Sequence, residues 1–235
     1  MFESPNLPRE DLPPRVPSKA DSLASLVATH NPPRNYDLQV AERTRALARE
    51  FEVTLISEIN ASGRTFEILG VDTAPNGSRP GGTIFLSGGV HGEEPAGVVA
   101  VLDFLEVHAP AFLDQFRFRA IPCVNPSGYQ SGLRKGVNGV DLNRNFFDGS
   151  QQPEVQAVYS FLKSGPQEFA ATFDFHEIDI FWADEGFSAS DNPLGYYFYE
   201  TTRVAEKRFG PKMIEQANVF GEPCIWKSIY GDKNE

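Results

Sequence analysis

Three residues of this 235-residue chain have the side chains and the spacing to bind one metal ion. His91 and Glu94 are three positions apart where a strand is expected to give way to a helix, so an imidazole nitrogen and a carboxylate oxygen could reach the same ion. His176, distant in sequence, would complete a His₂Glu set with one position left for water, which is typical of catalytic zinc. Each histidine taken alone could equally be structural, His91 as a loop residue beside a helix start and His176 as a partly buried ring with a backbone partner.

A second group of polar residues could bind a substrate carboxylate and a scissile carbonyl. Arg144 could grip a carboxylate with two parallel hydrogen bonds, which lysine cannot do, and Asn143 adds a side-chain amide beside it. Arg134 is a further cation in the same region, suited to polarising a carbonyl or holding an oxyanion. Asp141 is a candidate acceptor for the second N–H group of a ligand histidine. The alternative is that both arginines are solvated loop charges.

These residues fall where the expected strands end. Strands are expected over 51–56, 66–71, 83–87, 116–123, 170–175 and 196–199, and helices over 38–47, 96–105, 154–162 and 201–217, the last with a break at 210–211. Strands that alternate with helices predict an α/β fold with a mixed, largely parallel sheet flanked by helices on both faces. In such sheets ligands bind at the carboxyl ends of strands. The polar clusters at these ends are His91–Glu94, Asn125–Tyr129 and His176–Glu177, with Asp141–Asn145 between the last two.

Composition and charge narrow the class of protein. The formal net charge is −11, from 21 Lys and Arg against 32 Asp and Glu, which argues against a nucleic-acid-binding protein. No run approaches the ~18 apolar residues that a membrane helix needs, and the N-terminus lacks the pattern of a secretory signal. Cys123 and Cys224 are too few for a disulfide framework and fit a reducing compartment, so a cytoplasmic location is expected.

The chain is expected to have two parts. Residues 1–35 are proline-rich and are expected to form an extended arm, and residues 36–235 are expected to form the catalytic domain. None of these features indicates the oligomeric state.

Four sequence blocks, in this order, resemble the zinc carboxypeptidase family of the carboxypeptidase A type, with its small bacterial members and the related N-acyl amino acid deacylases. The blocks are His91–Glu94, Asn125–Tyr129, Gly139–Phe146 and Asp174–His176. The Asp-Leu-Asn-Arg-Asn-Phe sequence in the third block is the most specific, and the resemblance is close over about residues 80 to 180. It implies a twisted, mixed sheet between helices and one zinc ion. It also implies these roles: zinc binding by His91, Glu94 and His176, carboxylate recognition by Asn143 and Arg144, carbonyl polarisation by Arg134, and orientation of His91 by Asp141.

The resemblance implies a zinc-dependent metallocarboxypeptidase that hydrolyses an amide bond next to a free carboxylate through a metal-activated water. The expected substrate is a small peptide or an N-acyl amino acid with a free carboxylate, and no nucleic acid or membrane partner is expected. Two alternatives stay open: an N-acyl amino acid deacylase of the desuccinylase or aspartoacylase type, and a zinc- or carboxylate-binding relative without catalysis. Glu93 slightly favours the peptidase, because the deacylases more often carry Asn or Asp before the ligand glutamate.

The general base is the one part of the family's machinery without a clear match. In the family a catalytic glutamate follows the third ligand on a late strand, before a small residue or Thr and then Pro. Glu222 precedes Pro223 and stays open as an alternative base, although residues 218–221 make a poor strand. Glu200, Glu206 and Glu215 are expected to be solvated beside a helix. The chain ends in a polar, turn-like sequence without an expected closing strand. The C-terminal part of the domain, with the base, is therefore expected beyond residue 235.

Overall fold

The computed structural model describes residues 34–74, 77, 79–177, 196–198, 200, 208–217 and 225–229. The chain divides into two units, residues 1–175 and residues 176–235. Nearly all of the proline-rich arm expected over residues 1–35 lies outside the described residues, so the arm stays a prediction.

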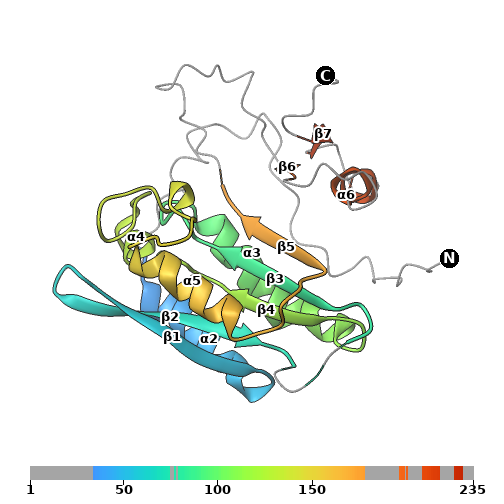
Figure 1. The fold of residues 1–235 in the computed structure, drawn as a ribbon, viewed down its shortest axis with the longest axis horizontal. Coiled ribbons are helices and arrows are strands. Elements are labelled where there is room, and N and C mark those ends of the chain that lie inside the picture. The colour runs from blue at the N-terminus through green and yellow to red at the C-terminus, as the bar shows by residue number, and fades with distance from the viewer. Residues whose placement is uncertain are drawn as a thin grey trace. The chain divides into compact units, whose positions relative to one another are not determined.

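The first unit is built on a five-stranded sheet in the order β1-β2-β4-β3-β5. Its strands are β1 Glu52–Ala61, β2 Arg64–Asp72, β3 Thr83–Gly88, β4 Arg117–Ile121 and β5 Ala171–Phe175. β2 pairs antiparallel with β1 and β4, whereas β3 pairs in parallel with β4 and β5. The sheet is mixed, as expected, and its parallel half brings the carboxyl ends of β3, β4 and β5 to the same end of the sheet (Figure 1).

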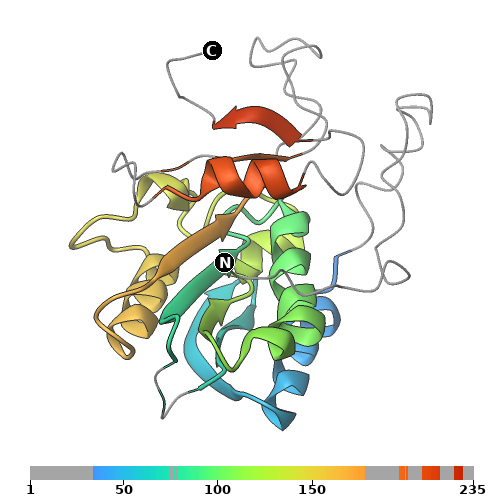
Figure 2. The same cartoon turned by 90° about the vertical axis from the view of Figure 1, so that its right-hand side faces the viewer.

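Helices cover both faces of this sheet, as the sequence predicted. Figures 1 and 2 show α5 on one face and α2 and α3 on the other. Proline stands at the start of α3, α4 and α5, where its missing N–H group is not needed and its fixed φ favours the helix. The helical elements of this unit are η2 Asp37–Ala41, α2 Glu42–Ala46, η3 Leu47–Arg49, α3 Pro95–Asp103, η4 Phe104–His108, η5 Ala109–Phe112, α4 Pro126–Ser131, η6 Leu142–Arg144 and α5 Pro153–Lys163.

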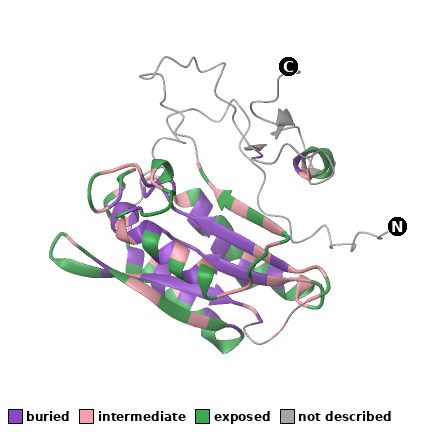
Figure 3. Ribbon diagram, in the orientation of Figure 1, coloured by how far each residue is buried: buried purple, intermediate pink, exposed green. Residues whose placement is uncertain are grey.

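The apolar core lies between the sheet and these helices (Figure 3). β3 is buried along its length apart from the half-buried Ile84, which is the burial expected of a central strand with both faces covered. Val98 and Leu102 of α3 and Val155 of α5 have no exposed surface. Exposure is higher in β1 and β5, the two outer strands of the described sheet.

One helical stretch, Pro95–Phe112, is long and apolar enough to cross a membrane by length and composition alone, whereas the sequence analysis found no such run. Charged residues within the stretch interrupt the apolar run in the sequence. Val101 and Leu105 on its inner face belong to the core. Asp103 and Glu106 on its outer face pair with Arg43. These are the contacts of a helix packed on the sheet of a globular unit.

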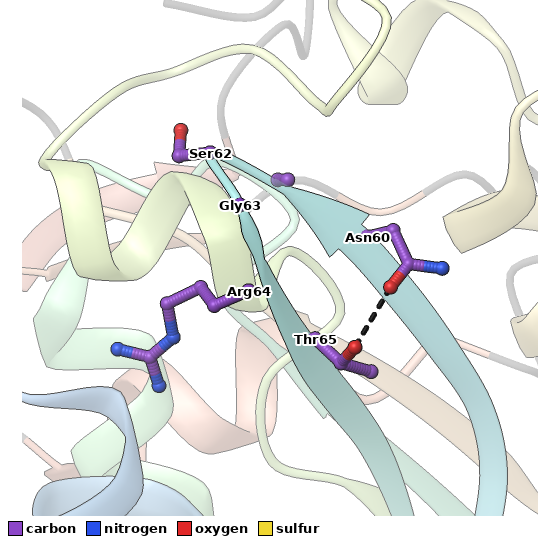
Figure 4. Close-up of a pocket in the computed structure, with 6 residues that line it drawn as sticks. Asn60, Ser62, Gly63, Arg64 and Thr65 are labelled. Carbon is purple, nitrogen blue, oxygen red and sulfur yellow. Dashed lines mark hydrogen bonds between the residues drawn. The ribbon is translucent and has the colours of Figure 1, made fainter.

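A tight hairpin joins β1 to β2 (Figure 4). Its two-residue loop, Ser62–Gly63, has positive φ at both positions, 52° and 75°, as in a type I′ turn. The hydroxyl of Thr65 donates to Asn60 Oδ1 at 2.7 Å across the hairpin. A pocket at this tip is lined by residues 60–65, which include no carboxylate, histidine or cysteine. It therefore has none of the chemistry expected of the functional site.

A buried ion cluster joins β2 to β4. The Asp72 carboxylate accepts hydrogen bonds from Arg117 Nε at 2.8 Å, from Arg119 Nε at 3.0 Å and from the Ala74 N–H group at 3.0 Å. The side chains of Asp72 and Arg119 are only 8% and 3% exposed. The Arg119 guanidinium also lies 4.0 Å from the centroid of the Phe161 ring in α5. Because an unpaired buried charge is costly, losing one partner of this cluster would destabilise the packing of β2 and β4.

The described part of the second unit contains a parallel pair of strands, β6 Tyr196–Phe198 and β7 Ile225–Ile229, and the helix α6 Gly210–Ala217. β6 confirms an expected strand, whereas β7 was not expected. α6 begins at the Gly210–Pro211 pair, where a break within a longer helix was expected. The expected helical residues 201–207 lie outside the described residues.

Glu200 is buried, so the expectation of a solvated side chain was wrong. Its carboxylate accepts hydrogen bonds from the N–H groups of Phe209 at 3.0 Å and Gly210 at 2.8 Å, and from Arg208 Nε at 2.7 Å. Burial raises the pKa of Glu200, but these hydrogen bonds and the charge of Arg208 outweigh it, so the pKa lies below the ordinary 4.5. The carboxylate thus satisfies N–H groups at the start of α6, which have no partner within the helix.

Candidate metal centre

His91 and Glu94 lie in the turn between β3 and α3. The Glu94 N–H group closes the turn by donating to the His91 carbonyl oxygen at 3.2 Å. His91 Nδ1 lies 2.6 Å from Glu94 Oε1, and the two side chains are only 3% and 8% exposed. The two predicted ligands therefore present a nitrogen and an oxygen to the same point.

Close backbone contacts hold this turn in place. A Cβ atom added at Gly92 would lie 2.1 Å from the carbonyl carbon of Gly128, so only glycine fits between the turn and α4. The Asn125 N–H group donates to the Gly89 carbonyl oxygen at 2.9 Å, which extends the pairing of β3 with β4 beyond the strands themselves. The glycine that follows His91 in the sequence is therefore required by packing.

Asn125 accounts for the Asn-Pro-x-Gly block of the sequence. Its Oδ1 accepts from the Gly128 N–H group at 2.9 Å and caps α4, a helix that was not expected from the sequence. Its Nδ2 donates to the Lys135 carbonyl oxygen at 3.0 Å, and the residue has no exposed surface. One buried amide thus links the end of β4 to the loop that carries Arg134.

His176 supplies the third predicted ligand. It directly follows Phe175, the last residue of β5, which pairs with Gly88 at the end of β3. One ligand atom each from His91, Glu94 and His176 lies within 4.8 Å of the others. Zinc ligands lie about 2.0–2.2 Å from the ion, so any two are at most about 4.4 Å apart, and this group is close to that size. No other group of three or more His, Cys, Asp or Glu side chains in the described ranges is arranged in this way.

Asp141 contacts the other side of the His91 ring. Its Oδ1 lies 3.0 Å from His91 Nε2. With Nε2 engaged in this way, Nδ1 faces Glu94 and is the nitrogen available to a metal. Burial raises the pKa of Asp141, but the hydrogen bond and charge of His91 and the charge of Arg134 outweigh it, so the pKa lies below the ordinary 3.8. The contact between Asp141 and His91 that the family resemblance implied is therefore present.

Arg134 lies beside the predicted ligands. Its Nε donates to Asp141 Oδ2 at 3.2 Å, and its Nη1 donates to Glu93 Oε1 at 3.3 Å and to Glu94 Oε1 at 3.4 Å. The side chain is 30% exposed, so it is both held by three carboxylates and accessible. Arg134 is not a solvated loop charge.

Asn143 and Arg144 are exposed on the short helical turn η6, which begins directly after Asp141. The Asp141 carboxylate caps this turn by accepting from the Asn143 N–H group at 2.9 Å. Leu142, with no exposed surface, anchors the turn in the core. The Arg144 side chain has no hydrogen-bond partner in the part of the chain that the structure describes, so its guanidinium is available to a ligand.

Comparison with known proteins agrees with this geometry. A family model described as zinc carboxypeptidase matches residues 60–184, just over half of the chain. This chain belongs to the zinc carboxypeptidase family. Murein peptide amidase A of Escherichia coli (strain K12) is 45% identical over 86 residues, which are 37% of this chain and 33% of that protein. The N-acyl-aromatic-L-amino acid amidohydrolase (carboxylate-forming) of Homo sapiens is 32% identical over 101 residues, 39% of this chain and 31% of that protein. The chain thus spans about a third of the length of these curated relatives.

Solved structures of zinc carboxypeptidases have the same α/β fold. A protein from Shewanella denitrificans aligns with 88% of this chain and 54% of its own, with a TM-score of 0.61 at 17% identity. A metallo-carboxypeptidase from Pseudomonas aeruginosa aligns with 79% of this chain and 49% of its own, with a TM-score of 0.54 at 18% identity. The fold class expected from the sequence is confirmed.

The sequence pointed to the three proposed ligands and to Asp141, but not to the other residues that support the ligand turn. Asn125 could have been identified as a helix cap, because Asn before Pro at a helix start is a recognised signal. No sequence signal links Arg34 to the ligand turn, 58 residues away. Glu222, the less favoured alternative for the general base, lies outside the described residues.

Proposed function

We propose that this protein is a zinc-dependent metallocarboxypeptidase that hydrolyses an amide bond next to a free carboxylate. The observation that carries the proposal is the convergence of His91, Glu94 and His176 on one point, with Asp141 bound to the far side of the His91 ring. Two histidines and one glutamate are the donor set of catalytic zinc and leave one position for water or substrate. We propose one zinc ion in this site.

A zinc ion held by this group would supply Lewis acidity and a water activated near neutral pH. Asp141 would keep the proton of His91 on Nε2 and so leave Nδ1 as the ligand atom. Arg134 would donate N–H groups to the oxygen of the scissile carbonyl as negative charge develops there. To do so, Arg134 would exchange its long contacts with Glu93 and Glu94 for the substrate oxygen.

Asn143 and Arg144 would bind the free carboxylate of the substrate. The planar guanidinium of Arg144 can form two parallel hydrogen bonds to a carboxylate, and the Asn143 amide can add another. Both residues follow Asp141 on η6, so a carboxylate bound there is tied through Asp141 to the His91 ring. Their proposed role is to place the amide bond and to take no part in the bond-breaking step.

An N-acyl amino acid deacylase is the second candidate function, favoured by the match with the human amidohydrolase. Both substrate classes carry a carboxylate, so Asn143 and Arg144 would serve either. The name of the Escherichia coli relative makes a murein peptide the first peptide to test. A zinc- or carboxylate-binding relative without catalysis is the third candidate, because the sequence offers no clear match to the family's catalytic glutamate.

A hydrolysis assay tests the three candidates. The zinc-loaded protein is incubated with peptides that have a free carboxylate, murein peptides among them, and with N-acyl amino acids, with and without a chelator. Chelator-sensitive cleavage of peptides supports the peptidase, and cleavage of N-acyl amino acids alone supports the deacylase. Zinc binding without any cleavage supports the non-catalytic relative.

Elemental analysis tests the metal ligands. His176→Ala is expected to lose most of the bound zinc, because only two of the three proposed ligands remain. His108→Ala is the control, since His108 is an exposed histidine of η4 outside the group. Unchanged zinc content in His176→Ala would refute the assignment.

A cytoplasmic location and the absence of nucleic-acid and membrane partners are also proposals. The location is supported by cysteine usage, since Cys123 is a free, buried thiol. The acidic net charge of −11 supports the absence of a nucleic-acid partner.

A further inference from the structure

Arg34 contacts the turn that carries His91 and Glu94. Its Nη1 donates to the Gly92 carbonyl oxygen at 2.5 Å, and its Nη2 donates to the Glu93 carbonyl oxygen at 2.8 Å. Gly92 and Glu93 are the two residues that separate the proposed ligands. One guanidinium therefore binds both carbonyl groups inside the ligand turn.

Arg34 is itself fixed to α4. Its carbonyl oxygen accepts from Gln130 Nε2 at 2.7 Å, and Gln130 Oε1 accepts from the Tyr36 N–H group at 3.0 Å. Its guanidinium lies 5.7 Å from the centroid of the Tyr129 ring, within the range of a cation–π contact. Because Gly92 packs against the same helix, Arg34 and the ligand turn share one support.

The partners of Arg34 distinguish it from a residue that only fastens one helix to another. Its Nε is buried and has no hydrogen-bond partner among the described residues, so this nitrogen has lost water without gaining a bond, while Nη1 and Nη2 bind the two carbonyl groups. Arg43 provides the contrast, since it fastens the same N-terminal segment to α3 and η4 through the side chains of Asp103 and Glu106 and, within the described part of the chain, makes no hydrogen bond to the turn between His91 and Glu94.

We infer that Arg34 is a positioning residue for the metal ligands. By holding the carbonyl groups of Gly92 and Glu93, it fixes the 92–93 and 93–94 peptide planes, which set the position of Glu94 relative to His91. The inference rests on the proposed zinc site and adds the residue that prepares it. A ligand pair already in place loses less conformational freedom on binding, so the affinity for the ion is higher. Lysine cannot replace this contact fully, because one ammonium group lacks the planar fork that reaches both oxygens.

The test uses the full chain with Arg34→Met, Arg34→Lys and the matched control Arg43→Met. Zinc affinity is measured by competition with a chelator, with folding checked by circular dichroism. Amide hydrogen exchange of residues 90–94 is measured in the metal-free protein. Arg34→Met is expected to weaken zinc binding by about 10- to 100-fold, the range for residues that orient metal ligands, and to speed exchange in the turn. Arg34→Lys should lie between Arg34→Met and the wild type, and Arg43→Met should change the zinc affinity less than threefold.

Any other outcome overturns either the positioning role of Arg34 or the proposed function on which it rests. Zinc affinity of Arg34→Met within threefold of the wild type, or unchanged exchange in the turn, overturns the positioning role. An equal loss in Arg43→Met overturns it as well, because the effect would then come from general stability. If Arg34→Met does not fold, Arg34→Lys decides, and a loss of less than threefold overturns the inference. A wild-type protein that binds no zinc overturns the proposed function itself and, with it, this inference.

Discussion

Replacing Asp141 with alanine is expected to weaken zinc binding by about 10- to 100-fold. Asp141 Oδ1 lies 3.0 Å from Nε2 of His91, whose side chain is 3% exposed. Without this acceptor the ring is free to rotate or to move its proton to Nδ1, the nitrogen that faces Glu94. The substitution therefore acts on a ligand without removing one.

The size of the effect follows from the burial of the ring. A buried donor left without its acceptor costs about 1–3 kcal/mol. At about 1.4 kcal/mol for each tenfold change, this corresponds to roughly 5- to 150-fold in affinity. The free energy of unfolding should fall separately by about 1 kcal/mol, because Asp141 also caps η6 through the Asn143 N–H group. The part-exposed ion pair of Asp141 with Arg134 adds at most about 1 kcal/mol.

Two measurements separate these effects. The zinc dissociation constant is obtained by competition with a chelator, and the free energy of unfolding of the metal-free protein is obtained by urea titration. Asp141→Asn retains an acceptor oxygen and should lose less zinc affinity. Asp37→Ala is the control, since Asp37 is an exposed aspartate paired with Arg64 at 2.7 Å. If folded Asp141→Ala binds zinc within twofold of the wild type, the ring does not depend on this contact and the reasoning is wrong.

Three further perturbations test other parts of the structure. Arg144→Lys should lower kcat/KM by an amount equivalent to about 1.5–3 kcal/mol, because the planar fork to the substrate carboxylate is lost; an unchanged kcat/KM would place the carboxylate site elsewhere. Asp72→Ala should lower the free energy of unfolding in urea by about 3–5 kcal/mol, because it leaves the buried Arg119 without its carboxylate, and a loss below about 1 kcal/mol would contradict the cluster's role. The pKa of Glu200 is lower in the folded chain than the ordinary 4.5, so its stabilising contribution is present above that value and is lost as the pH falls through the folded-state pKa. Glu200→Gln should therefore reduce the loss of stability between pH 6 and pH 3 in urea titrations, and the same loss in both proteins would count against this contribution.

The parts of the fold that the sequence predicted well are those with strong local patterns. β3 and β5 lie within one residue of their expected bounds, because short apolar runs between polar clusters define them. The meeting of His91, Glu94 and His176 could be predicted for a topological reason, since parallel strands end on the same side of a sheet. This prediction depends on where each ligand follows its strand, and not on which residues stand beside it in the sequence.

The features that the sequence did not predict depend on contacts between distant segments. Arg34 and Gly92 meet because both pack on α4, and no periodic pattern records such a meeting. Glu200 was expected to be solvated because a glutamate near a helix usually is, and only its hydrogen bonds to the start of α6 explain its burial. β7 could have been found, since Ile225, Trp226 and Ile229 belong to a short run rich in strand-forming residues.

The strand order determines when the proposed zinc site becomes complete during synthesis. Ile84 of β3 pairs with Phe118 on one side and with Ala171 on the other. During synthesis, β3 is therefore available long before β5, and until β5 arrives one edge of β3 has unpaired N–H and C=O groups that favour aggregation. Pairing over such a distance along the chain is also slow. The nascent chain is most prone to aggregate while β5 is missing. Because His176 directly follows β5, the chain holds only two of its three proposed ligands during this same interval. Zinc would then bind after the sheet of the first unit is complete and would stabilise it, without helping to assemble it.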